Sequence, residues 1–118
     1  MKSLAEEGDA DAQTLLGSMY AEGKGGVKDG KIAMEWLLRA AKQGHAKAQF
    51  YLGAIFESGD GAPKDLTEAY KWYYLASLND DGKGTFSSAL FRIVNVMPTA
   101  LVADGRRRAE TWAEKHSK

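Results

Sequence analysis

The sequence contains no cysteine and carries no net charge. The absence of cysteine excludes disulfides, thiolate nucleophiles and thiolate metal sites, although it does not choose between a reducing and an oxidising compartment. Sixteen basic and sixteen acidic side chains cancel, so no overall field draws the chain onto nucleic acid or an anionic membrane surface. We therefore expect no nucleic-acid partner.

Long hydrophobic runs are also missing. No window approaches the roughly 18 apolar residues of a membrane span. The N-terminal stretch MKSLAEEGDADAQ lacks the apolar core of a signal peptide. We expect no membrane insertion, and the localisation stays open: cytoplasmic, or periplasmic if a leader has been removed.

Motifs that carry chemistry are sparse. His45 and His116 lack paired-ligand spacing, so we predict no metal site and expect both side chains to be exposed to solvent. The stretch EGKGGVKDG lacks the frame of a phosphate-binding loop, and NDDGKG lacks that of a calcium-binding loop, so both are predicted to be turns. The Arg106–Arg108 triplet shares its helix with acidic residues, so we expect it to be a solvated face rather than a binding site for RNA or an acidic partner. No serine has a histidine at the spacing of a known motif, so a nucleophilic triad is unsupported. The sequence therefore predicts no catalytic residue and no cofactor, and we do not expect an enzyme.

What the sequence does contain is an internal copy. Residues 5–40 and 41–76 agree at 14 of 36 positions, whereas unrelated segments would share roughly two or three. A repeat of this length is typical of a solenoid, in which each unit buries its apolar face against its neighbours.

Each unit is predicted to form two helices. The first, helix A, has apolar residues at helical spacing and ends at Gly23 in one copy and Gly59 in the other. The second, helix B, is predicted to begin after an N-cap, Asp29 or Asp65. Gly44 is predicted to end the first helix B.

Two finer features follow from single residues. Glu68 stands three residues after Asp65, which is a variant of the capping box. Gly17 and Gly53 recur in the middle of helix A, where glycine costs roughly 1 kcal/mol relative to alanine. Their recurrence predicts a neighbouring helix that lies too near for any side chain.

The two copies resemble a known repeat. The segments AQTLLGSMYAEGKGGVKDGKIAMEWLLRAAKQG and AQFYLGAIFESGDGAPKDLTEAYKWYYLAS look like the Sel-one-like repeat, a relative of the tetratricopeptide repeat. They share its AQ-x-x-LG-x-x-Y helix, with Phe56 in place of the tyrosine in the second copy, its G-x-G loop and its A-x-x-W second helix, over about residues 5–78. The resemblance implies adaptor, scaffold or regulatory roles, often in bacterial envelope, signalling or secretion settings.

The pattern weakens after residue 78. TFSSALFRIVNVM keeps helical apolar spacing but resembles a degenerate helix A. Pro98 and Thr99 are predicted to open a last helix, polar on one side, with Asp104–Arg108 and Arg106–Glu110 pairs at i,i+4. Such a helix suits the end of a solenoid, which needs a wettable outer face.

The predicted fold is therefore an all-α, right-handed α-α superhelix of about six antiparallel helices. It forms a single domain over residues 1–118. Repeat 1 covers about residues 5–40 and repeat 2 about 41–76; a degenerate third repeat and a C-terminal capping helix cover about 83–116.

The N-terminal end differs from the C-terminal one. The stretch LAEEG aligns with the tail of a helix B whose body is missing, so the apolar flank of the first helix A is expected to lie uncovered. Two explanations stay open: the chain was cut from a longer array, or something else covers that flank. Self-association through this end is one form of the second.

The predicted function is a non-enzymatic protein–protein interaction module that binds a peptide, helix or loop of another protein on its concave helix-A face. The alternative is an inhibitor or immunity-type protein that blocks a partner enzyme. The predicted partner-binding residues are the outward positions that differ between the copies: Asp11, Thr14, Ser18, Glu22, Lys47, Phe50, Ala54, Glu57 and Ser58. Phe50 is read in two ways, as an exposed anchor for the partner or as a side chain that packs on Tyr20 or the adjacent helix.

Overall fold

The computed structural model describes residues 2–24, 26, 28–79 and 86–116, and none of these lies in a β-strand. The predicted turn NDDGKG lies outside the described residues except for Asn79. The helices are α1 (Lys2–Glu6), α2 (Ala10–Glu22), α3 (Gly30–Lys42), α4 (Ala46–Ser58), α5 (Leu66–Leu78), α6 (Ser87–Val94) and α7 (Thr99–His116). The predicted all-α repeat fold is confirmed. Seven helices are described where about six were expected, because the first residues of LAEEG lie in a short helix, Lys2–Glu6.

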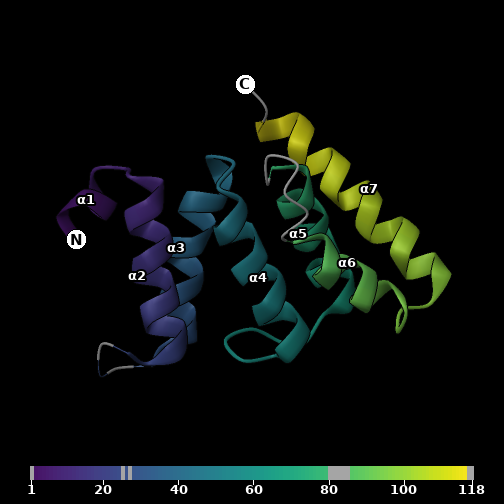
Figure 1. Cartoon of the computed structure of the whole chain (residues 1–118), viewed down its shortest axis with the longest axis horizontal. Coiled ribbons are helices and arrows are strands. Elements are labelled where there is room, and N and C mark those ends of the chain that lie inside the picture. Colours follow the sequence, from purple (N-terminus) through teal and green to yellow (C-terminus); the bar gives the residue numbers. More distant parts are fainter. Residues whose placement is uncertain (1, 25, 27, 80–85, 117–118) are drawn as a thin grey trace.

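The helices follow one another along the long axis of the molecule (Figure 1). α2 packs against α3, and α4 against α5, so that each repeat is a hairpin of an A helix and a B helix. α3 in turn contacts α4 and so joins the two hairpins, while both α6 and α7 pack on α5. Each hairpin therefore completes its hydrophobic core by packing against the neighbouring helices.

The predicted helix ends are confirmed where they depend on local chemistry. Gly23 and Gly59 close α2 and α4 with φ of 74° and 79°, a left-handed conformation that glycine adopts without strain. Asp29 caps α3 by accepting from the backbone N–H groups of Lys31 and Ile32, at 3.0 and 3.1 Å. These residues fix where each hairpin turns.

The predicted capping box at α5 is only half formed. Asp65 accepts from the Glu68 backbone N–H at 3.1 Å, as expected of an N-cap. The Glu68 carboxylate does not return the bond, because it pairs with Lys71 at 3.2 Å and with Arg108 of α7 at 2.8 Å. Glu68 thus helps to hold the last helix rather than its own helix start.

The mid-helix glycines mark where the two helices of a hairpin approach most closely. A Cβ atom on Gly17 would lie 2.7 Å from Cγ of Leu37, and one on Gly53 would lie 2.6 Å from Cδ1 of Tyr73. Both distances are shorter than real Cβ contacts, so the prediction of a neighbour too near for a side chain is confirmed. Gly105 of α7 marks another close approach, because a Cβ atom on it would lie 2.8 Å from Cδ1 of Tyr70 in α5. The sequence analysis did not identify this glycine.

A buried glutamine joins one repeat to the next. Gln49 in α4 is 0% exposed, and its side-chain amide N–H donates to the carbonyl oxygen of Ala41 in α3 at 3.1 Å. Its amide oxygen accepts from the side-chain amide of Asn79, just after α5, at 3.1 Å. One side chain therefore bonds both to the preceding repeat and to the end of its own.

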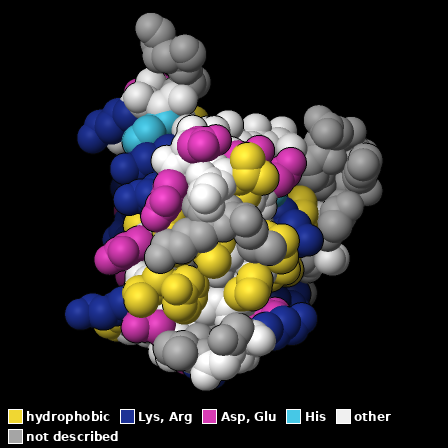
Figure 2. Space-filling model, turned by 90° about the vertical axis from the view of Figure 1, so that its left-hand side faces the viewer, with side chains coloured by type: hydrophobic (Ala, Val, Ile, Leu, Met, Phe, Trp, Pro, Cys, Tyr) yellow, Lys and Arg dark blue, Asp and Glu magenta, His cyan; other side chains and the backbone are white. Residues whose placement is uncertain are grey.

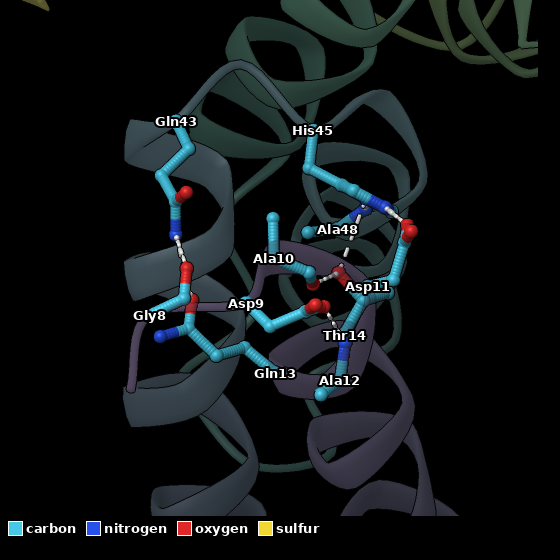
Figure 3. Close-up of polar contacts among 10 residues, drawn as sticks. All are labelled: Gly8, Asp9, Ala10, Asp11, Ala12, Gln13, Thr14, Gln43, His45 and Ala48. Atoms are coloured by element: carbon cyan, nitrogen blue, oxygen red, sulfur yellow. Dashed lines mark hydrogen bonds and ion pairs between the residues drawn. The ribbon is translucent and has the colours of Figure 1, made fainter. Parts of the chain in front are cut away.

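The same arrangement occurs 36 residues earlier. Gln13 donates to the carbonyl oxygen of Ala5 in α1 at 2.9 Å and accepts from the Gln43 amide at 3.0 Å. Gln43 also donates to the carbonyl oxygen of Gly8 at 3.0 Å (Figure 3). α1 thus occupies the place of the tail of a helix B, as the alignment of LAEEG predicted.

The α1 end of the molecule is partly apolar. Figure 2 looks onto this end and shows hydrophobic side chains gathered on its lower half, with acidic side chains beside them. The opposite end is formed by α7, whose Asp104–Arg108 and Arg106–Glu110 pairs, at 3.3 and 3.7 Å, are confirmed. The two ends of the solenoid therefore present different surfaces.

Glu57 of α4 links three helices. Its carboxylate accepts from the Tyr73 hydroxyl of α5 at 2.6 Å and from the Arg92 guanidinium of α6, through Nη1 and, at 2.9 Å, Nη2. The hydrogen bonds from Arg92 hold the pKa of Glu57 below its ordinary value, although burial acts in the opposite direction. The predicted partner-facing Glu57 is thus engaged inside the chain and ties α6 to α4 and α5.

Replacing Gly53 by alanine tests the close approach of α4 and α5. In an exposed helix this change stabilises by about 1 kcal/mol. Here the new methyl group would meet the buried Tyr73 ring, so we expect Gly53→Ala to lower the free energy of unfolding by about 1–3 kcal/mol, measured by urea denaturation. The exposed Ser88→Ala in α6 is the control; a stabilised Gly53→Ala would contradict the close approach.

Replacing Glu57 by glutamine tests the link to α6. Because the folded-state pKa of Glu57 is lowered, its charge stabilises the fold above the pKa of the unfolded state, and this contribution disappears as the pH falls through the folded-state pKa. We expect Glu57→Gln to cost about 1 kcal/mol near neutral pH, a figure reduced by the exposure of Arg92, and to cost less in acid. Urea denaturation at about pH 7 and about pH 3 measures the difference. Equal losses at both pH values would show that the charge is not involved, and the exposed Glu35→Gln is the control.

Candidate interaction surface

Two adjoining hollows run along the side of the molecule where α2 and α4 lie. The first, of about 240 Å³, is lined by Asp11, Thr14, Leu15, Ser18, His45, Lys47 and Tyr51. The second, of about 250 Å³, is lined by Ala21, Glu22, Phe50, Tyr51, Ala54, Ile55, Ser58 and Asp60. Because Tyr51 lines both, we treat them as one feature, the α2–α4 groove.

Eight of the nine predicted partner-binding residues line this groove. They form four pairs, each separated by 36 residues: Asp11 and Lys47, Thr14 and Phe50, Ser18 and Ala54, Glu22 and Ser58. Each pair differs in charge, polarity or size between the two repeats. The ninth residue, Glu57, lies outside the groove.

The eight residues are not equally accessible. The side chains of Asp11, Glu22, Lys47 and Ser58 are exposed. Thr14 and Ser18 are buried, and their hydroxyls donate to the backbone carbonyl oxygens of Ala10 and Leu15, at 2.9 and 2.8 Å. They form the floor of the groove rather than its surface.

Phe50 packs inside the chain. Its ring centroid lies 5.6 Å from that of Tyr73 in α5 and 5.0 Å from that of Phe86, the residue before α6. Phe50 is half-buried and packs on adjacent elements, which is the second of the two interpretations given above. Its described ring contacts include Tyr51 but not Tyr20. The apolar part of the groove surface is instead supplied by other residues.

Leu15 and Tyr51 supply that surface. They are a further pair separated by 36 residues, and the sequence analysis did not select either. Leu15 is 49% exposed, which is high for a large apolar side chain, and Tyr51 is half-buried, with the Lys47 ammonium 6.0 Å from its ring centroid. The sequence does contain a signal for this pair. An apolar residue directly precedes both Leu16 and Leu52, at a position where a helix with one buried face needs none.

His45 crosses from one repeat to the other (Figure 3). Its Nε2 lies 2.6 Å from the Asp11 carboxylate and its Nδ1 lies 3.1 Å from the Thr14 hydroxyl, both on α2. The same Nδ1 accepts from the Ala48 backbone N–H at 3.3 Å, so that His45 is the N-cap of α4. The side chain is only 20% exposed, and the expectation of an exposed His45 is wrong.

The 36-residue period indicates that His45 is an N-cap. The position 36 residues earlier is Asp9, which caps α2 by accepting from the Ala12 backbone N–H at 2.9 Å. Because His45 caps α4 through Nδ1, its other ring nitrogen, Nε2, is left for a second partner. That nitrogen meets Asp11. His116, in contrast, is exposed and stacks on Trp112 of α7.

Two larger hollows, of about 420 and 520 Å³, lie beside α7, and neither is lined by a predicted partner-binding residue. Among the described residues, no three acidic or histidine side chains converge as a metal site would require. Within the same ranges, no helix combines the length and the apolar character needed to cross a membrane. The α2–α4 groove is therefore the candidate interaction surface.

Comparisons with known proteins agree with this architecture. The family model described as the Sel1 repeat matches residues 10–45 and 46–81, a frame that keeps the 36-residue period and begins five residues later than ours. No curated protein matches the chain.

Two solved structures are similar to most of the chain. One is c5321, described as a protective antigen present in uropathogenic Escherichia coli strains and displaying an SLR fold; it is 29% identical with a TM-score of 0.87 over 95% of this chain and 24% of its own. The other is a Sel1 repeat protein from Oxalobacter formigenes, 33% identical with a TM-score of 0.69 over 90% of this chain and 45% of its own. The chain thus spans less than half the length of either structure.

The two matched repeats cover more than half of the residues, and the hairpins, glycines and caps that define them are all in place. Such repeats are typically non-catalytic and generally mediate protein interactions. This chain belongs to the Sel1 repeat family.

Proposed function

We propose that the chain is an interaction module, an adaptor or scaffold, that binds a segment of another protein in the α2–α4 groove. The observation that carries the proposal is the convergence of the four differing pairs on one surface. Residues that match between the copies maintain the hairpins, whereas residues that differ are free to serve a particular partner. The groove also lies on the A-helix side, which lines the concave surface of helical-repeat proteins.

The lining of the groove favours a segment with an apolar anchor. Leu15 is exposed and both Tyr51 and Phe50 are half-buried in the groove, and an aromatic residue at the centre of a contact surface often contributes most to affinity. Asp11 and Lys47 stand at one end with opposite charges, and Glu22 stands at the other. A partner segment would place its apolar residue over Leu15 and Tyr51 and its polar residues over these charges.

The groove is held in shape before any partner arrives. His45 connects α2 to the start of α4 through Asp11, and Gln49 fixes α4 against α3. Surfaces that are already ordered lose less conformational entropy on binding. A partner would therefore bind the groove at a smaller cost in conformational entropy.

The groove assignment can be tested with peptides selected from a random library against the whole chain. We expect Leu15→Glu and Tyr51→Ala each to weaken binding of the selected peptides about tenfold or more, because each removes apolar contact area at the centre of the groove. Affinity is measured by fluorescence anisotropy, and circular dichroism verifies that the helices persist.

The control is Phe91→Ala, which removes an exposed aromatic side chain, 70% accessible, from α6. Peptides whose affinity falls with Phe91→Ala but not with the groove variants would refute the assignment. If the natural partner proves to be an enzyme that loses activity on binding, the module is an inhibitor rather than an adaptor.

A further inference from the structure

We propose that the smaller of the two hollows beside α7, of about 420 Å³, binds an acidic segment of a partner protein. Residues of α5 and α7 line this hollow, and the two helices pack on each other (Figure 1). It shares no lining residue with the α2–α4 groove. It is therefore a second interaction surface, separate from the first.

The hollow has an excess of positive charge. Four basic side chains line it, against one carboxylate, that of Glu68. The four are Lys71 of α5 and Arg107, Arg108 and Lys115 of α7. Because the whole chain has no net charge, this excess is a local feature. It attracts a negatively charged segment to this side of the molecule in particular.

Ion pairs within the chain compensate only part of this charge. The Glu68 carboxylate is shared between Lys71, at 3.2 Å, and Arg108, at 2.8 Å. The Asp104 carboxylate is shared in the same way between Arg107, at 3.0 Å, and Arg108, at 3.3 Å. Two carboxylates thus serve three cations, and a further carboxylate from a partner would complete the set.

Two of the cations are directly available to a ligand. Lys115 is exposed, and within the part of the chain that the structure describes it has no ion-pair partner. The Arg107 side chain is 71% exposed. Its guanidinium has several donors in a fixed fork, so it can bind a second carboxylate while it keeps Asp104.

The hollow also has an apolar wall, which is supplied by Trp112 of α7. This residue is half-buried, and its ring is held by an edge-on contact with Trp72 of α5, 5.2 Å between centroids. It also stacks on His116, at 4.1 Å. An ordered aromatic ring beside exposed cations suits a segment in which a hydrophobic side chain lies among acidic ones.

The structure separates the three residues of the Arg106–Arg108 triplet. From the sequence, all three are expected on a solvated face, because acidic residues share their helix. Arg107 and Arg108 line the hollow, whereas the Arg106 guanidinium lies 5.6 Å from the centroid of the Tyr74 ring. Glu110 does not line the hollow and pairs with Arg106, at 3.7 Å. Only Arg106 is thus left on the solvated face.

A protein carboxylate is favoured over the phosphates of a nucleic acid. Nucleic-acid binding gains most from contacts with many successive phosphates, whereas these cations gather at one hollow. Glu110 and Glu114, exposed on the same helix, would repel a phosphate backbone that ran along α7. The occupant is therefore a short acidic segment with one hydrophobic residue.

The test uses the whole chain and a short fluorescent peptide in which one leucine is flanked on each side by glutamates. We expect saturable binding that weakens as salt is added, and no binding of the matched peptide with glutamines in place of the glutamates. Arg107→Gln should lower the affinity about tenfold, because it removes a charge-assisted contact with the peptide. Fluorescence anisotropy measures the affinity, and circular dichroism verifies the fold.

Arg106→Gln is the matched control, since it removes the same charge from the adjacent residue of α7 and should leave the affinity nearly unchanged. If Arg107→Gln fails to fold, Lys115→Gln replaces it. Absence of binding, or equal losses from Arg106→Gln and Arg107→Gln, would overturn the proposal. So would tighter binding of a single-stranded RNA that Arg107→Gln abolishes, or a dimer in light scattering that the same change dissociates. Tyr51→Ala should have no effect here, so the groove proposal fails independently.

Discussion

The buried carboxamide of Gln49 is the contact on which the rest of the arrangement depends. A polar group without access to water is costly unless it is hydrogen-bonded, so its two bonds, to Ala41 and Asn79, have to be satisfied together. Hydrophobic packing alone leaves helices free to slide along one another. A directional bond to one particular carbonyl group removes that freedom and fixes the register of each hairpin on the next.

The glycines set the distance between the two helices of each hairpin. Because Gly17 and Gly53 have no side chain, the residues facing them, Leu37 and Tyr73, reach the helix backbone. Register from glutamine and separation from glycine together determine where α2 and α4 lie. The groove is a result of both, since its lining residues come from two helices that belong to different hairpins.

Sequence reasoning succeeded where the cause is local or repeated. The caps at Asp29 and Asp65 and the turns at Gly23 and Gly59 depend on residues within a few positions of one another, and the 36-residue register made each visible twice. It failed where a side chain meets a residue more than thirty positions away, as with His45 and Asp11 or Glu57 and Arg92. His45 was expected to be exposed to solvent and Glu57 to face a partner, because the residues that each one contacts could not be located from spacing. The outward positions that differ between the copies line the groove, but its exposed apolar residue, Leu15, could be identified only from the folded structure.

The order in which the helices touch has a consequence for how the molecule comes apart. The most extensive contacts lie within each hairpin, adjacent hairpins meet through α3 and α4, and α6 and α7 are attached chiefly through α5. Stability in such arrays is approximately a sum over neighbours, so opening begins at an end and spreads inward. A population in which α6 and α7 have detached would still keep α2, α3 and α4 together, so the α2–α4 groove would outlast the loss of both helices.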